Sequence, residues 1–170
     1  MKYAVFIFFF SVIFFIPLSV HAEYVLPYPS VMPGNKIYKV SRVVDELKRY
    51  WSFGSIAKAK YIMNMADKYL VEAKTLFEYK QYLLAFDALN RSDNEVIKLP
   101  SFIGAGISEK KNMSLIVSSI KEQMSVHEKL LETLKNELPS VFTWTPENEI
   151  STVLFIHDRL MESIKLRQEI

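Results

Sequence analysis

The chain has 170 residues, with 21 Lys and Arg residues against 19 Asp and Glu and a formal net charge of +2. This near-balance excludes the strongly basic character typical of nucleic-acid-binding proteins, so we expect no nucleic-acid partner. The chain has no cysteine, which excludes disulfides, a thiol nucleophile and a lipid-modified cysteine.

The first 22 residues have the layout of a secretory signal peptide. A lysine precedes an almost unbroken apolar run over residues 4–16, Pro17 interrupts it, and Ala22 ends a Val-x-Ala cleavage site. We therefore expect a cleavable signal peptide over residues 1–22 and a secreted or extracytoplasmic protein of the cell envelope. The alternative is an uncleaved anchor, because residues 3–20 approach the ~20 residues that a membrane span needs. Contact with a membrane is expected only in that case.

Residues 23–38, EYVLPYPSVMPGNKIY, form a proline-rich segment ahead of the first predicted helix. Prolines and a glycine favour extended and turn conformations, whereas the apolar content is too high for a plain linker. We expect an ordered arm that lies across the helices and covers part of their core. The alternative is a docking segment for a partner, since proline- and tyrosine-rich segments suit recognition. The residues expected in this binding arm are Tyr24, Pro27, Tyr28, Pro29, Pro33 and Tyr38.

The pattern of the remaining residues, 39–170, predicts one all-α domain. We expect it to be a bundle of about five helices without strands. Apolar residues at helical spacing indicate a short amphipathic helix over 39–51 and a hairpin of two helices over 56–89. We place the break between those two helices at Glu78-Tyr79-Lys80. The second helix is expected to fade into the polar segment Asn90–Glu95.

The second half of the chain predicts a loop followed by two further helices. Residues 99–108 contain one proline and two glycines, which favour a loop. Residues 111–138 carry a coiled-coil-like seam of apolar residues that Pro139 ends. Thr145-Pro146-Glu147 is typical of an N-cap, an N1 proline and a first-turn acid, so we expect the last helix to begin there.

Two histidines outside the leader, His127 and His157, fall on the seams of the last two helices. In an antiparallel hairpin that turns near Phe142, they lie at equal distances from the turn and face one another. Such a pair could hold a metal with Glu128 or Asp158 beside it, or act as a pH-sensitive joint. The alternative is two core histidines with backbone or tyrosine partners. Two ligands fall short of a structural zinc site, so no metal site is predicted and the pair is kept as a hypothesis.

No catalytic constellation occurs in the sequence. It lacks a G-x-S-x-G motif, and its acidic residues occur singly among lysines on helix faces, as on a solvated surface. Aromatic residues at helical spacing indicate core rather than a ligand groove. We therefore expect a protein that is not an enzyme, with no catalytic residue, no cofactor-binding residue and no cofactor.

Three stretches together resemble a known family: Tyr24-x-Leu26-Pro27-Tyr28-Pro29, the Pro33 that leads to Tyr38, and the helix segment ADKYLVEA over residues 66–73. In order and spacing they are similar to an uncharacterised family of bacterial exported helical domains, classed as a domain of unknown function. The resemblance covers residues 24–89, and beyond them only the helical character matches. It implies an exported helical fold and no particular activity.

The sequence favours a non-enzymatic exported helical domain that binds another envelope or secreted protein. Its expected surface is a groove between residues 56–89 and the proline-rich arm. The alternative is an envelope stress, metal-sensing or pH-sensing accessory protein that works through His127 and His157.

Overall fold

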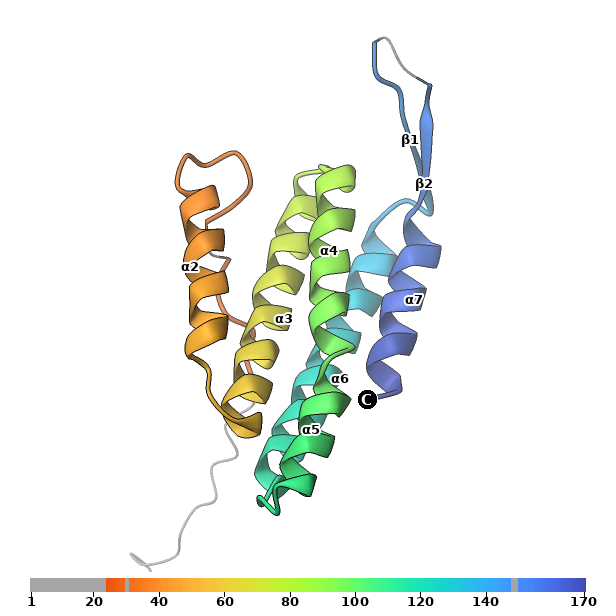
Figure 1. Cartoon of the computed structure of the whole chain (residues 1–170). Coiled ribbons are helices and arrows are strands. Elements are labelled where there is room, and N and C mark those ends of the chain that lie inside the picture. Colours follow the sequence, from red (N-terminus) through yellow and green to blue (C-terminus); the bar gives the residue numbers. More distant parts are fainter. Residues whose placement is uncertain (1–23, 30, 148–149) are drawn as a thin grey trace, which may run out of the picture.

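A computed structural model of the chain describes residues 24–29, 31–147 and 150–170. The predicted signal peptide over residues 1–22 lies outside them. The helices are α2 (Tyr38–Trp51), α3 (Ser55–Glu78), α4 (Tyr82–Val96), α5 (Leu99–Ser108), α6 (Ser114–Glu137) and α7 (Ile156–Gln168), and the strands are β1 (Val141–Trp144) and β2 (Thr152–Phe155). Figure 1 shows a helical bundle in which α5 continues the line of α4 and the two strands project beyond the helices. The predicted all-α fold class is confirmed.

Within the described ranges, no helix combines the length and the apolar character needed to cross a membrane.

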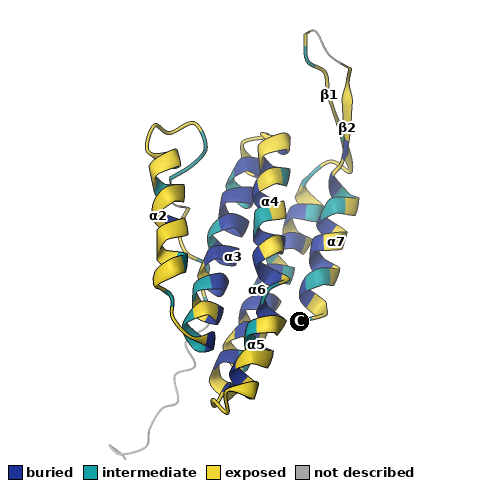
Figure 2. Cartoon of the chain, in the orientation of Figure 1, coloured by how far each residue is buried: buried dark blue, intermediate teal, exposed yellow. Residues whose placement is uncertain are grey.

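Two apolar cores hold the bundle together. The first lies among α3, α4, α6 and α7, and includes Leu70, Phe77, Leu89, Leu131 and Leu160. The second lies nearer α5 and includes Ile62, Val96, Leu99, Ile120 and Met124. Fully buried alanines let α3 and α4 approach closely, because a small side chain on one helix makes room for a large one on its neighbour. Figure 2 shows the buried residues concentrated on the inner sides of α3, α4, α6 and α7.

The break between α3 and α4 falls where it was predicted, although no glycine or proline marks it. Lys80 adopts a left-handed backbone with φ of 59°. Its N–H donates to the Phe77 carbonyl at 2.9 Å, and the Gln81 N–H donates to the Leu76 carbonyl at 2.9 Å. These two bonds form a Schellman motif, which satisfies the last carbonyls of α3.

The predicted loop over residues 99–108 is wrong, because these residues form helix α5. Pro100 sits in the first turn, where the missing N–H has no intrahelical partner to lose. Gly106 is buried, and a Cβ there would overlap the Met113 side chain. That glycine therefore serves close packing between the end of α5 and the segment that leads into α6, and does not form a turn.

The predicted fading of α4 over Asn90–Glu95 is also wrong, since the helix continues to Val96 and buries Ser92, Asp93 and Glu95. Periodicity of apolar residues cannot detect a helix turn that buries polar side chains against polar partners.

The segment between α6 and α7 forms an antiparallel β-hairpin, in place of the predicted loop and early helix start. Val141 pairs with Phe155, and Trp144 pairs with Thr152. The last helix begins at Ile156, so the predicted start at Thr145-Pro146-Glu147 is wrong, as is the expectation that strands are absent. Phe142 fixes the base of the hairpin, because its ring centroid lies 4.6 Å from that of Tyr82 on the bundle.

Candidate binding surface

Helix α2 is held against the bundle by its polar side. Asp45, the one buried residue in this fully described helix, forms an ion pair with Lys68 of α3. The Asp45 backbone carbonyl accepts a hydrogen bond from the Tyr61 hydroxyl at 2.6 Å. Near the end of α2, Arg49 Nη2 donates to Glu95 Oε1 of α4 at 2.6 Å. Charged side chains therefore fill the space that apolar side chains occupy in an ordinary helix contact.

The beginning of α2 is attached in the same polar way. The Tyr38 hydroxyl donates to Glu72 Oε1 at 2.7 Å and accepts a hydrogen bond from Arg91 Nη1 at 2.6 Å. Arg91 also pairs with Glu72 at 3.0 Å, and its guanidinium carbon lies 5.1 Å from the centroid of the Tyr69 ring. Burial raises the pKa of Tyr38, and it raises the pKa of Tyr69 to about 12. Both phenols therefore remain protonated at neutral pH.

The opposite side of α2 carries a contiguous apolar surface that faces solvent, which we call the α2 face. Its exposed fractions run from 42% for Val44 to 75% for Tyr50. The 3.6-residue helix repeat places these side chains within an arc of about 140°, on the side away from Asp45 and Arg49. An amphipathic helix normally turns such a stripe toward the core. Figure 2 shows α2 exposed along most of its length. The face consists of Ile37, Val40, Val43, Val44, Leu47, Tyr50 and Trp51.

Basic side chains border the α2 face. Lys39 lies beside Tyr50 on one edge of the arc, and Lys48 lies beside Val44 on the other. Lys36 and Arg42 are also exposed on this segment, and Glu46 is its exposed acid. The surface around the stripe is therefore predominantly positive.

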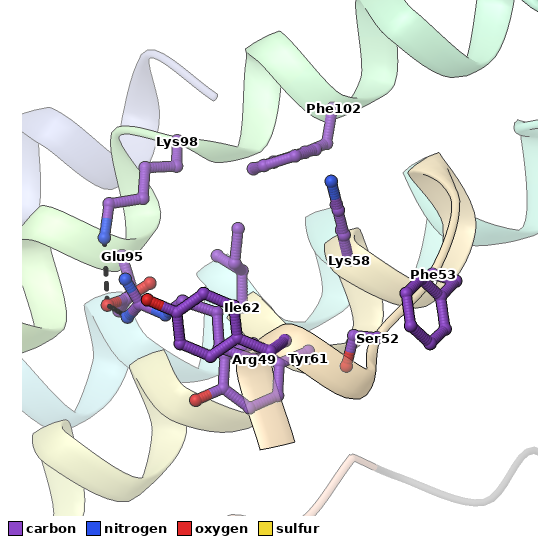
Figure 3. A pocket seen from close by; sticks show the side chains of 10 residues that line it. Arg49, Ser52, Phe53, Lys58, Tyr61, Ile62, Glu95, Lys98 and Phe102 are labelled. Atoms are coloured by element: carbon purple, nitrogen blue, oxygen red, sulfur yellow. Dashed lines mark hydrogen bonds and ion pairs between the residues drawn. The ribbon is translucent and has the colours of Figure 1, made fainter. Parts of the chain in front are cut away.

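A cavity of about 330 Å³ opens where the end of α2 meets α3 and α5 (Figure 3). Glu95 lies at its polar end, where Oε1 accepts hydrogen bonds from Arg49 and from Lys98 Nζ at 3.0 Å. Glu95 Oε2 is buried and has no hydrogen-bond partner among the described residues. The cavity thus combines an aromatic lining with a buried carboxylate at its polar end. Its lining is Arg49, Tyr50, Ser52, Phe53, Lys58, Tyr61, Ile62, Glu95, Lys98 and Phe102.

The proline-rich arm is attached to the bundle mainly through Tyr24. The Tyr24 hydroxyl donates to Asp67 Oδ2, and the Tyr24 N–H donates to Glu122 Oε1 at 3.1 Å. Burial and the hydrogen bond to Asp67 raise the pKa of Tyr24. Met32 packs against the first core, whereas Tyr28 is 96% exposed.

A groove of about 410 Å³ lies between the arm and α3, where the sequence predicted a groove. Of the predicted arm residues, Tyr24, Pro27 and Tyr28 line this groove. Pro29 is exposed, Pro33 is half-buried, and Tyr38 belongs to the contact with α2 described above. The structure therefore brings only part of the predicted set to one surface.

The groove and the cavity are linked by a shallow depression along the junction of α2 and α3. Asn64 lines both the arm groove and this depression. Ser52 and Tyr61 line both the depression and the cavity. The groove, the depression and the cavity, which together we call the furrow, therefore adjoin one another beside α2 from the arm to α5.

A chain of buried polar side chains crosses the bundle from Asp67 to Asp93. Asp67 Oδ1 accepts hydrogen bonds from Gln123 Nε2 at 2.5 Å and from His127 Nε2 at 2.6 Å. Arg167 Nε donates to His127 Nδ1 at 3.2 Å, and Arg167 Nη1 donates to Asp93 Oδ1 at 2.6 Å. Because arginine can only donate, His127 carries its proton on Nε2 and is neutral. Burial lowers the pKa of His127, in agreement with the neutral ring.

The Asp67–His127 pair has the residue types of a catalytic dyad but not its geometry. A catalytic histidine needs its second nitrogen directed at a nucleophile or a substrate. In this chain that nitrogen accepts from Arg167, and His127 has no exposed surface. The arrangement can hold α3 and α6 to α7, and it offers no route for proton transfer to a bound molecule.

The expectation that His127 and His157 face one another is wrong. His157 Nε2 lies 2.9 Å from the Leu138 carbonyl oxygen, at the start of α7. The β-hairpin moves the turn away from Phe142 and shifts the register, so that Arg167 lies opposite His127 instead. Among the described residues, no group of three or more His, Cys, Asp or Glu side chains is placed to hold a metal ion.

Sequence reasoning missed Asp67, Asp93 and Arg167, which organise the buried polar chain. The buried positions of α7 include Leu160, Ser163 and Arg167. Their three-four spacing is that of one helix face, so a charged residue on a face with apolar neighbours was the available signal.

A comparison with family models matches residues 30–141 to a model described as Domain of unknown function (DUF5667). The matched stretch contains α2 to α6, and it excludes the Tyr24–Pro29 entry and α7. No curated protein and no solved structure matches the chain.

Proposed function

The chain belongs to the DUF5667 family of unknown function, because the matched residues 30–141 make up more than half of it, and from that premise we propose a non-enzymatic binding module of the cell envelope. The predicted resemblance to an uncharacterised family is thereby confirmed. Export through the leader over residues 1–22 is part of the proposal. The binding surface we assign is the α2 face together with the furrow beside it.

The observation that carries the proposal is the orientation of α2. Fully burying one large apolar side chain is worth about 1.5–3 kcal/mol, so the α2 face leaves on the order of 10 kcal/mol of hydrophobic stabilisation unused. Contiguous apolar patches on a soluble surface are typical of interaction sites. The polar side of α2 forms ion pairs with the bundle through Asp45 and Arg49, so a simple rotation of the helix would bury its stripe only by breaking those pairs.

The non-enzymatic part of the proposal is supported by the buried polar chain. His127 has both ring nitrogens bonded to protein groups and no exposed surface. The described lining of the cavity at the end of α2 contains the Glu95 carboxylate, which already accepts from Arg49 and Lys98, and no paired base and nucleophile. Its aromatic side chains suit recognition of an apolar group.

One observation favours the alternative of a pH-sensing protein. A neutral His127 lies between Asp67 and Arg167, so its protonation would place a new positive charge beside a buried guanidinium. The metal-sensing version has no such support, since His127 and His157 are held apart by different partners.

Site-specific photo-crosslinking in intact cells tests the proposal. A photoreactive amino acid replaces Leu47 in the full-length, tagged chain, and the matched control carries it at Leu115, an exposed apolar residue of α6. We expect adducts, with protein or with lipid, from position 47 that position 115 does not form. If the two positions give the same pattern, or if neither forms an adduct, the α2 face is not the binding surface and the proposal is refuted.

A further inference from the structure

The α2 face combines an apolar stripe, aromatic residues at one end and basic borders, and we propose that it docks on an anionic phospholipid surface. Helix α2 then lies in the plane of the membrane interface, with its stripe in the headgroup and upper acyl region. This inference rests on the proposed function, because it names the partner of the same surface.

The geometry of α2 suits docking parallel to a membrane. Helices that lie in an interface have one apolar side, one polar side and basic residues beside the stripe. The aromatic residues Tyr50 and Trp51 stand at the end of α2, with the exposed Phe53 directly after it. Tyrosine and tryptophan favour the headgroup level, where one end of the ring is apolar and the other is hydrated.

The position of α2 in the molecule leaves the stripe accessible to a flat surface. Figure 1 shows α2 at one side of the molecule, with α3 between it and α6 and α7. Its polar contacts with α3 and α4 include those of Tyr38, Asp45 and Arg49, which lie on the side opposite the stripe. The bundle therefore does not stand between the α2 face and a membrane.

The charges around the stripe favour anionic lipid. Over residues 36–51, Lys36, Lys39 and Lys48 are exposed and Glu46 is the exposed acid, while Arg42 is exposed farther round on the polar side. Lys39 and Lys48 stand on opposite borders, so each can lay its hydrocarbon stem along the apolar layer and bring its ammonium to a phosphate.

A second copy of the chain is a poorer occupant of the α2 face. Two such faces packed together would bring basic border against basic border, and like charges in an interface oppose association. A membrane has no such conflict. This route to the membrane is separate from an uncleaved leader, the one source of membrane contact that the sequence predicts.

Vesicle flotation of a chain that begins at Glu23 tests the inference. Such a chain contains every described helix and both apolar cores, and its circular dichroism confirms folding. In a Trp144→Phe background, Trp51 is the sole tryptophan and its emission reports the environment of the α2 face. We expect flotation and a blue shift with vesicles of equal parts phosphatidylglycerol and phosphatidylcholine, and far weaker binding to phosphatidylcholine alone.

Two substitution pairs separate the charge effect from general loss of basic residues. Lys39→Gln with Lys48→Gln should weaken partitioning by roughly 10- to 30-fold, at about one kcal/mol for each base near an anionic surface. Lys121→Gln with Lys129→Gln, on exposed positions of α6, should leave partitioning unchanged. Leu47→Ser should reduce binding to both vesicle types, because it interrupts the stripe.

Three results would overturn the inference: no flotation with either vesicle, equal flotation with both, or light scattering that shows a stable dimer lost on Leu47→Ser. Protein adducts at position 47 without vesicle binding would refute the lipid partner while leaving the proposed binding function in place. Absence of both would refute both.

Discussion

Replacing Arg167 with methionine is expected to destabilise the fold severely. The methionine keeps most of the buried stem but removes the guanidinium, which is 1% exposed and bonds to Asp93, Ser92, Ser163 and His127. Removing one partner of a buried ion pair leaves the other charge without compensation, at a cost of about 3–5 kcal/mol. That is a large share of the roughly 5–15 kcal/mol by which such domains are stable.

The loss is measured by urea unfolding at pH 7, followed by circular dichroism. For a chain of this length, about 3–5 kcal/mol corresponds to a fall of roughly 6–20 °C in melting temperature. Arg159→Met is the matched control, because Arg159 bonds to the other oxygen of Asp93 at 2.5 Å but is partly exposed. It should cost only about 1–2 kcal/mol.

A double variant checks the cause. Adding Asp93→Asn to Arg167→Met should cost less than the sum of the two single changes, because the methionine variant has already lost the ion pair. If Arg167→Met melts within the error of the unmodified chain, the buried polar chain does not stabilise the fold and the structural role assigned to it is refuted.

Further changes test the arm, the buried histidine and two glycines. Tyr24→Phe should cost about 1–3 kcal/mol in urea unfolding, because a buried carboxylate loses a donor, while Tyr28→Phe should change stability by under about 0.5 kcal/mol. The pKa of His127 is lowered from 6.5 by burial, so the unfolded chain takes up its proton first and stability should fall as pH drops below 6.5. His127→Gln should show a weaker pH dependence. Gly104→Ala, in open space on α5, should add about 0.5–1 kcal/mol, and Gly54→Ala, at φ of 84°, should cost about 1–3 kcal/mol.

Each of these expectations has a definite contrary result. Equal effects of Tyr24→Phe and Tyr28→Phe would show that the arm is not anchored through the Tyr24 hydroxyl. Parallel stability curves for the unmodified chain and His127→Gln between pH 5 and 7.5 would remove the pH-sensing alternative. A stabilising Gly54→Ala would show that the turn before α3 does not need its left-handed glycine.

Apolar periodicity predicted the helices where side chains pack by size and hydrophobicity. The stripes within residues 39–51, 56–77 and 111–138 all correspond to helices in the structure. The break at Lys80 was also located correctly, because the apolar pattern changes phase there. By contrast, the proline and glycines of residues 99–108 favoured a loop, although these residues form a helix. A glycine in a sequence can indicate either a turn or close packing, and here it serves packing against Met113.

The candidate site was far less predictable. Its buried carboxylates, Asp45, Asp67 and Asp93, each bond to a partner in a distant part of the chain. A single sequence does not show which distant residues pair. The amphipathic pattern of α2 was recognised, but periodicity does not say which side of a helix faces the protein. Its orientation is set by Lys68 and Glu95, which attract its polar side.

The polar attachment of α2 also has a consequence for motion. Neither apolar core contains a residue of α2, so the helix can separate from α3 while the side chains of each core keep their contacts with one another. Its backbone amides should therefore exchange with solvent through a local opening of lower free energy than global unfolding. Because salt screens ion pairs and not apolar burial, that opening should become easier at high ionic strength while the amides of α3 and α6 keep their protection.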